Sequence, residues 1–480
     1  MSSAFQDKNL YALHEGLQKG DFSSVELTNH FLSVIEAKDK DVNAFITVTA
    51  ERALADAKDA DARRAKGEAR GMLDGIPGAL KDNICTRGIR TTSASRMLEN
   101  FVPAYSATVA NKLAAAGMVL LGKLNMDEFA MGQASETSYF GPVKNPVDLT
   151  RVPGGSSGGS VAAVAAGEAA FTLGSDTGGS ILQPAALTGV TGLRPTYGLV
   201  SRQGIVAFAS SLDQAGPITK DTRDNAIVLA AIAGYDPRET TSAKRPAVDY
   251  LDGIDAGVAG LTFGLAKEYF VEGVAPEIQE AVLEMAKRLE AKGATIKQIS
   301  LPSMRHGLAT YVLITAAEAS SNLARFDGIH YGFRPADVSD LEDIYFKSRT
   351  FGFGDEVKRR LMLGTFALSE HAYDQYYKKA LLVREKITKE FNQELASLDA
   401  ILAPVTPSTA WPLGEKITDP VQSYLNDAFT VSMGLAGLPA LSLPIAKDKQ
   451  GLPIGMQIIG KQFSERLLYQ IGVAVEEVRG

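Results

Sequence analysis

Pro153-Gly-Gly-Ser-Ser-Gly-Gly-Ser160 and Gly174-Ser-Asp-Thr-Gly-Gly-Ser180 are two glycine-rich clusters, and they place Ser156 and Ser180 24 residues apart. Glycine allows tight backbone turns and lets amide N–H groups approach a ligand closely. A serine at the end of such a turn is typical of a nucleophile that lies beside its own oxyanion hole. Each cluster therefore offers a serine that is a candidate nucleophile.

The segments that flank these clusters argue against the alternative interpretation, a flexible Gly/Ser linker. Val161-Ala-Ala-Val-Ala-Ala-Gly167 predicts a helix, and Ala170-Phe-Thr-Leu173 predicts a short buried strand. Strands, helices and turns alternate in this way to about residue 230, which is typical of an α/β sheet. Similar patterns predict helices over 8–38, 50–69, 108–116, 125–131, 276–292 and 464–478, and strands over 118–122, 294–299, 400–403, 440–444 and 455–460.

Composition excludes several classes of protein. The chain has 480 residues, of which 45% are hydrophobic and 22% charged, and its net charge of −7 does not suggest a broad basic face for nucleic acid. This charge leaves RNA contact through a partner possible. Because Cys85 is the only cysteine, no intrachain disulfide can form, which fits a reducing compartment. No secretory signal and no apolar run of about 18 residues is present, so we expect a cytoplasmic protein without membrane contact.

The chain shows no internal repeat and no linker long enough to separate two domains. We therefore expect one domain over residues 1–480. Residues 304–396 look mainly helical and carry many Tyr, Phe and Arg side chains, so we expect them to form a helical cap or insert over a site.

The usual hydrolase and metal motifs are missing. Ser180 lies in no Gly-x-Ser-x-Gly elbow, and the chain has no metal-binding pattern of histidines or cysteines. A Ser-His-Asp triad stays possible, but nothing points to one. The histidines lie far from both serine clusters in sequence: His14, His30, His306, His330 and His371.

A catalytic serine without a histidine needs another base, and a lysine can serve if burial keeps it neutral. Lys81 lies in the largely apolar run Ala79-Leu-Lys-Asp-Asn-Ile84. The alternative is a structural lysine paired with Asp82 or another carboxylate, and composition alone favours that alternative.

Together, Leu80-Lys-Asp-Asn83 and the two glycine-rich clusters resemble the amidase signature family. The resemblance implies an α/β fold with a large, mixed, twisted β-sheet covered on both faces by helices. It also implies a Ser–cis-Ser–Lys triad in which Ser180 is the nucleophile, Ser156 follows a cis peptide bond and bridges, and Lys81 is the base. By the same resemblance, backbone N–H groups of Thr177, Gly178, Gly179 and Ser180 form the oxyanion hole.

Three longer stretches are similar to the A subunits of glutamyl-tRNA(Gln)/aspartyl-tRNA(Asn) amidotransferases: Lys123–Gly132, Ala317–Gly328 and Glu356–Ser369. This similarity implies a chain that hydrolyses glutamine and passes ammonia to a B subunit, which amidates the mischarged tRNA. A small C subunit helps to hold A and B together. The chain itself then needs no metal or cofactor, ATP and Mg²⁺ belong to the partner, and tRNA is met only through the complex.

The same similarity implies a pocket for glutamine. Arg360 would bind the α-carboxylate, since arginine suits planar bidentate recognition, Asp427 would bind the α-ammonium, and Tyr311 would line the site. Ordinary alternatives exist for each residue: a helix-surface charge for Arg360, a helix cap for Asp427 and a core position for Tyr311.

One departure from the family stands beside the proposed nucleophile. Position 182 is Leu, where the family usually has an Arg that supports the serine loop through charge pairing, for which Asp176 is the candidate partner. An unpaired buried carboxylate is costly, so Asp176 needs another partner. Two alternative functions stay open: a stand-alone amidase acting on small amides, and a catalytically weakened scaffold subunit, which only Leu182 motivates.

Overall fold

A mixed β-sheet forms the centre of the molecule in the computed structural model, which describes residues 5–415 and 425–479. The described residues form an 11-stranded sheet in the order β1-β3-β2-β4-β6-β5-β10-β11-β9-β7-β8. The strands are β1 (Phe45–Val48), β2 (Pro77–Lys81), β3 (Val119–Leu124), β4 (Phe171–Asp176), β5 (Thr191–Arg194), β6 (Gln214–Thr219), β7 (Thr262–Ala266), β8 (Thr295–Ile299), β9 (Ala400–Pro404), β10 (Ala440–Lys447) and β11 (Pro453–Gly460).

Strand directions make this sheet mixed, as predicted. β2 is parallel to both β3 and β4, and β7 is parallel to both β8 and β9. The remaining neighbours are antiparallel, including the long β10–β11 hairpin. The predicted fold class is therefore confirmed.

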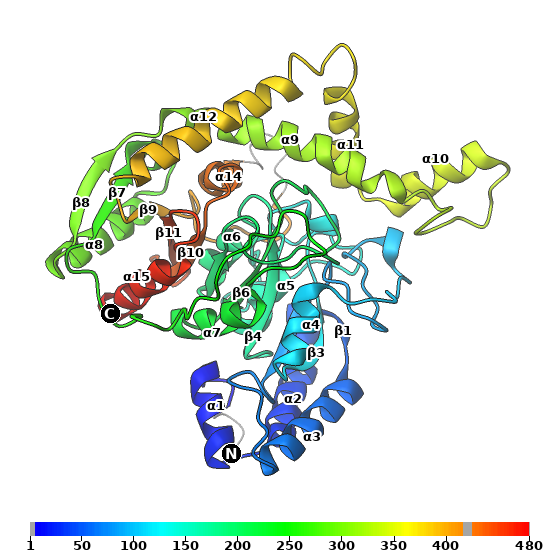
Figure 1. The fold of residues 1–480 in the computed structure, drawn as a ribbon. Helices are drawn as coiled ribbons and strands as arrows, with labels where there is room; N and C mark the ends of the chain where they lie inside the picture. The colour runs from blue at the N-terminus through cyan, green and yellow to red at the C-terminus, as the bar shows by residue number, and fades with distance from the viewer. Residues whose placement is uncertain (1–4, 416–424, 480) are drawn as a thin grey trace.

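Helices cover both faces of the sheet (Figure 1). Side chains alternate along β10, so that Leu441 lies against Gly472 of one helix while Ser442 donates a hydrogen bond to the Leu182 carbonyl of another. The helices are α1 (Leu10–Lys19), α2 (Ser24–Val42), α3 (Ala50–Ala65), α4 (Thr108–Ala115), α5 (Gly158–Ala165), α6 (Leu182–Thr188), α7 (Thr222–Ile232), α8 (Pro276–Ala291), α9 (Gly307–Asn322), α10 (Leu341–Gly352), α11 (Asp355–Ala367), α12 (Tyr377–Leu395), α14 (Ala428–Leu435) and α15 (Glu465–Val478).

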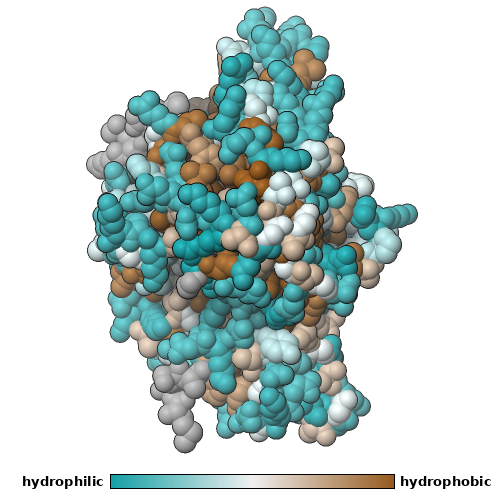
Figure 2. Space-filling view, turned by 90° about the vertical axis from the view of Figure 1, so that its left-hand side faces the viewer, coloured by the Kyte–Doolittle hydropathy of each residue, from teal (hydrophilic) through white to brown (hydrophobic). Residues whose placement is uncertain are grey.

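Helices α9 to α12 occupy the segment expected to be mainly helical. Figure 1 shows them as a row along one side of the molecule, with α10 extending furthest from the sheet. None of the described helices is long and apolar enough to cross a membrane. The face on the left of Figure 1 is mostly hydrophilic, with hydrophobic residues gathered near its upper part (Figure 2).

The helix predicted over 125–131 is wrong. Only a single 3₁₀ turn forms there, η2 (Glu128–Ala130), and Phe129 and Ala130 adopt positive φ angles of 51° and 61°. The Phe129 N–H donates to the Ser93 carbonyl instead of to the preceding turn of a helix. A backbone in the left-handed region cannot continue an α-helix, so this segment is a bent connection.

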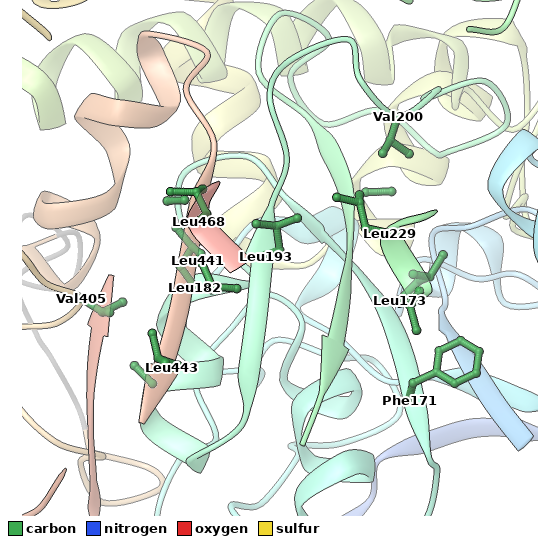
Figure 3. Close-up of a cluster of buried hydrophobic side chains, with 14 of the residues drawn as sticks. Phe171, Leu173, Leu182, Leu193, Val200, Leu229, Val405, Leu441, Leu443 and Leu468 are labelled. Carbon is green, nitrogen blue, oxygen red and sulfur yellow. The ribbon is translucent and has the colours of Figure 1, made fainter. Parts of the chain in front are cut away.

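The core fills the space between sheet and helices. Phe171 and Leu173 of β4, Leu193 of β5 and Leu182 of α6 are completely buried and belong to one large hydrophobic cluster (Figure 3). Leu182 is therefore a core residue whose side chain packs among other apolar groups. The glycine-rich turns on either side of β4 are thus held by a tightly packed interior.

Glu168, which follows α5, lowers the stability of the folded chain by an amount that depends on pH. It is fully buried, and both carboxyl oxygens have no hydrogen-bond partner in the described part of the chain. Burial, together with nearby Asp39, raises the pKa of Glu168 to about 9. Above pH 4.5 the unfolded chain releases this proton while the folded chain keeps it, so stability falls as pH rises toward 9.

We expect Glu168→Gln to raise the free energy of unfolding at pH 7 by about 2 kcal/mol. The gain should grow between pH 5 and pH 8, as followed by urea denaturation. Glu36→Gln, at an exposed position of α2, is the control and should show little change. A gain that is constant over this pH range would contradict the assignment.

Candidate active site

The end of β2 brings Lys81 to the first glycine-rich cluster. Its buried Nζ donates hydrogen bonds to Ser156 Oγ at 2.7 Å, to Ser157 Oγ at 2.8 Å and to the Ser175 carbonyl at 3.2 Å. The peptide bond between Gly155 and Ser156 is cis. The structure thus joins two of the three predicted catalytic residues directly.

The alternative partner of Lys81, Asp82, points elsewhere. Successive residues of a strand face opposite sides of the sheet, and Asp82 forms a buried ion pair with Lys123 at 3.2 Å. Its other oxygen accepts hydrogen bonds from the backbone N–H and hydroxyl of Thr92. The interpretation of Lys81 as a structural partner of Asp82 is therefore wrong.

Burial makes Lys81 unusually acidic for a lysine. Removal from water lowers the pKa of its amine to about 7, although Asp127, Asp176 and Asp213 oppose this shift. A charged amine is disfavoured in a dry interior. A substantial fraction of Lys81 is therefore neutral near neutral pH and able to accept a proton.

Ser156 and Ser157 both contact Lys81, but their hydroxyl groups differ in their other partners. Ser157 Oγ donates to the Ser175 carbonyl at 3.0 Å and accepts from the Ser175 N–H at 3.3 Å. These bonds tie Ser157 to β4. Within the described residues, Lys81 is the one hydrogen-bond partner of Ser156 Oγ, which makes Ser156 the better proton bridge.

Ser180 lies on the turn that follows β4, beside the first cluster. The Ser157 N–H donates to the Ser180 carbonyl at 3.1 Å, which holds the two clusters together. Ser180 is 8% exposed, whereas Lys81 and Ser156 are 0% exposed, so Ser180 is the member of the trio that an incoming molecule can reach. No hydrogen bond joins the hydroxyls of Ser156 and Ser180 in the described structure, and such contacts often tighten only when substrate binds.

The amides around Ser180 divide into two kinds. The Gly179 N–H donates to a carboxylate oxygen of Asp176 at 2.9 Å, so it shapes the turn and is already engaged. The N–H groups of Thr177, Gly178 and Ser180 have no acceptor among the described residues. The structure therefore favours these three amides over Gly179 as donors to an oxyanion.

Neighbouring helices hold this turn in place. Gly179 has φ of 121°, and a β-carbon there would lie 2.1 Å from Thr430 Oγ1 of α14, so glycine is required. Thr430 Oγ1 donates to the Gly178 carbonyl at 2.5 Å. A β-carbon at Gly178 would lie 2.6 Å from the ring of Tyr311 on α9, which places that ring against the turn.

Arg194 is a site residue that the sequence argument missed. Its guanidinium donates to the carboxylate and to the backbone carbonyl of Asp176, both at 2.7 Å, and to the Leu212 carbonyl at 2.7 Å. Both side chains of the ion pair are fully buried. Asp176 therefore has a cationic partner even though position 182 is Leu. The signal in the sequence was a lone arginine closing an otherwise uncharged strand, Thr191-Gly-Leu-Arg194.

The three residues expected to bind substrate are linked through their charges. Arg360 on α11 lowers the pKa of Asp427, at the end of η6 (Leu425–Asp427), and it also lowers the pKa of Tyr311, which burial and Asp427 raise. Burial raises the pKa of Asp427 to about 8, while Arg360 opposes the rise and Asp176 reinforces it. The Arg360 guanidinium also lies 5.4 Å from the centre of the Phe208 ring.

This arrangement supports acyl transfer through a serine nucleophile. It provides a hydroxyl on an amide-lined turn, a second hydroxyl and a buried amine that can take up a proton. The described residues contain no group of three His, Cys, Asp or Glu that could hold a metal ion.

Comparison with known proteins identifies relatives over nearly the whole chain. The model of the Amidase family matches residues 26–469. The A subunit of glutamyl-tRNA(Gln) amidotransferase from Moorella thermoacetica is 53% identical over 467 residues, which cover 97% of this chain and 96% of that protein. The crystal structure of the corresponding protein from Thermotoga maritima is 42% identical, with a TM-score of 0.82, and covers 99% of this chain and 96% of its own. The peptide amidase of Stenotrophomonas maltophilia is 30% identical, with a TM-score of 0.84 and coverage of 99% and 97%.

We expect Arg194→Leu to lower the free energy of unfolding by about 3 kcal/mol or more, because it leaves the buried Asp176 carboxylate unpaired. It should also slow covalent labelling of Ser180 by a sulfonyl fluoride. Arg63→Leu is the matched control, since Arg63 pairs with another buried aspartate, Asp74, which lies before the start of β2 and is distant in sequence from Ser180. It should cost stability without changing the labelling rate. Labelling of Arg194→Leu at the rate of the unsubstituted protein would contradict a role for Arg194 in holding the turn.

Proposed function

Because the chain belongs to the amidase family, we propose that it is the glutamine-hydrolysing component of a tRNA-dependent amidotransferase. In this function it releases ammonia from glutamine for a partner protein that converts Glu-tRNA(Gln) or Asp-tRNA(Asn) to its amide. The proposal extends to this chain what the names of its relatives say of those proteins.

The observation that carries the proposal is the buried contact between Lys81 and Ser156. A lysine amine whose pKa lies near 7 is suited to general-base catalysis, because the best catalytic pKa is close to the working pH. We assign to Ser156, which contacts this base, the relay of the proton from the more exposed Ser180. The pair thus supplies the base that a serine nucleophile lacks when no histidine is present.

The first half of the reaction forms an ester. Ser180 Oγ attacks the side-chain carbonyl carbon of glutamine while its proton passes to Ser156 and the Ser156 proton passes to Lys81. The carbonyl oxygen becomes an oxyanion that accepts hydrogen bonds from the amides of the 177–180 turn. When the C–N bond breaks, the proton returns through Ser156 to the leaving nitrogen, and ammonia departs from a glutamyl ester of Ser180.

Water completes the cycle. Lys81 and Ser156 withdraw a proton from a water molecule that attacks the ester carbonyl, and the same proton restores the Ser180 hydroxyl as the γ-carboxylic acid leaves. The acid then loses its proton to solvent and becomes glutamate, and no redox change occurs.

Opposite charges in the pocket suit an amino-acid substrate. We assign the α-carboxylate of glutamine to Arg360 and its α-ammonium to Asp427, with Tyr311 lining the space beside Gly178. An ammonium ion next to Asp427 favours the ionised carboxylate, so substrate binding opposes the rise in pKa that burial causes.

In this proposal, a partner protein uses the ammonia that this chain releases from glutamine. The B subunit would bind ATP, Mg²⁺ and tRNA, and the C subunit would join A and B. This chain would then meet tRNA only through the complex and needs no cofactor of its own. Its place would be the cytoplasm, where charged tRNA is used.

We expect Ser180→Ala to abolish glutamine-dependent amidation by the assembled complex while leaving amidation with added ammonium chloride close to normal, because only the ammonia source is lost. Ser160→Ala is the control: Ser160 lies in the same cluster but donates to the Leu173 carbonyl. Retained glutamine hydrolysis in Ser180→Ala would exclude Ser180 as the nucleophile.

We expect the rate of Ser180 labelling by a sulfonyl fluoride to rise about tenfold per pH unit below pH 7 and to level off above it, because only neutral Lys81 accepts a proton. This reagent carries neither carboxylate nor ammonium, so titration of Asp427 does not enter. Lys81→Ala should label slowly at every pH. A rate independent of pH between 5.5 and 9 would contradict the role of Lys81.

A further inference from the structure

Glu128 reaches from the bent segment after β3 to the junction of α10 and α11. Its Oε2 accepts a hydrogen bond from the Gly354 N–H at 2.8 Å, and its Oε1 accepts one from Ser95 Oγ at 2.5 Å. Ser95 Oγ is also within 3.3 Å of the Gly352 carbonyl. Glu128 is 3% exposed, so these bonds lie in the interior.

The contact leaves no room for a side chain at Gly354. A β-carbon there would lie 2.4 Å from Glu128 Oε2. Gly354 is the N-cap of α11 and has no side chain with which to cap the helix. Glu128 supplies a hydrogen-bond acceptor at this end of the helix. The next residue, Phe129, packs edge-on against Phe353 with ring centres 5.6 Å apart.

Helix α11 carries the arginine assigned to the substrate carboxylate. Glu356 lies in the first turn of α11, and its Oε1 accepts a hydrogen bond from Arg360 Nε at 2.8 Å. A shift of the first turn of α11 would therefore move the Arg360 guanidinium, and Glu128 contacts the residue at which this helix begins.

Asp127, the residue before Glu128, contacts the glycine-rich cluster that contains Ser156. The Asp127 N–H donates to the Ser156 carbonyl at 3.2 Å. A β-carbon at Gly155 would lie 2.1 Å from Asp127 Oδ2, so this carboxylate lies directly against the cis peptide unit. Two consecutive residues thus contact the catalytic serine cluster and the helix that carries Arg360.

We propose that Glu128 is a positioning residue for recognition of the substrate α-carboxylate, acting through the start of α11 on Arg360. The inference rests on the proposed function, because it takes glutamine as the substrate. It assigns to Glu128 an effect on substrate affinity that is separate from the proton transfer by Ser180, Ser156 and Lys81.

The test compares two amides in the full-length chain assembled with its partner proteins. L-Glutamine carries the α-carboxylate, and 4-aminobutanamide is the same molecule without it. In Glu128→Ala we expect kcat/KM for glutamine to fall ~10-fold, mainly through KM, and kcat/KM for 4-aminobutanamide to stay within ~2-fold. Glu128→Gln, which keeps an acceptor for the Gly354 N–H, should restore most of the loss. If the alanine variant does not fold, Glu128→Asp takes its place, because its side chain is one methylene too short to keep the bond to Gly354, and it should show the same selective loss for glutamine.

Glu476→Ala is the matched control. Glu476 accepts hydrogen bonds from the backbone N–H and the hydroxyl of Thr222 at the start of α7, and burial raises its pKa to about 7, as for Glu128. Its loss should lower stability and leave both kcat/KM values unchanged. Equal loss for both amides in Glu128→Ala or Glu128→Asp, or no loss for either amide in these two variants, overturns the inference while the proposed function stands. If the unsubstituted complex hydrolyses no glutamine, the proposed function fails and the inference fails with it.

Discussion

The burial of one amine, Lys81 Nζ, is the constraint on which the rest of the site depends. Three carboxylates lie near enough to stabilise its charge, yet each is committed to other partners: Asp127 to the Ser135 and Thr137 segment, Asp176 to Arg194, and Asp213 to Thr177 and two backbone amides. None of them forms an ion pair with Lys81. A direct ion pair would have kept the amine protonated, so the surrounding bonds preserve its ability to act as a base.

The ion pair of Asp176 and Arg194 has a second effect. Asp176 accepts the N–H groups of Gly179 and Ile181 on either side of Ser180, and Arg194 holds the same carboxylate from β5. The turn that presents Ser180 is therefore fixed by the charged pair of Asp176 and Arg194 and by Thr430. Leu182 is free to serve the hydrophobic core, and the idea of a weakened scaffold protein loses the feature that motivated it.

Much of the fold could be predicted from local sequence patterns. Helices such as α4 and α8 and strands such as β3 and β8 lie where periodicity and turn residues placed them. The bent segment at 125–131 could not be predicted, because its shape follows from distant partners such as Ser93. Within the site, the glycine-rich clusters and Lys81 indicated the proposed catalytic group, whose roles stay predictions. Arg194 and Glu128 were missed because their contacts join different elements of the chain. Glu128 and Gly354, for example, are 226 residues apart. The division into one domain with a helical cap also stays a prediction.

Asp127 and Glu128 are adjacent in the chain, which limits the spacing between the two parts of the site that they contact. Because one peptide bond separates the residue that contacts the Ser156 loop from the residue that holds α11, the chain length between them cannot vary. The distance between the Ser156 loop and the start of α11 is then set by covalent geometry as well as by packing. An insertion at this point would lengthen that distance, and with it the length of amide that fits between the serine cluster and Arg360.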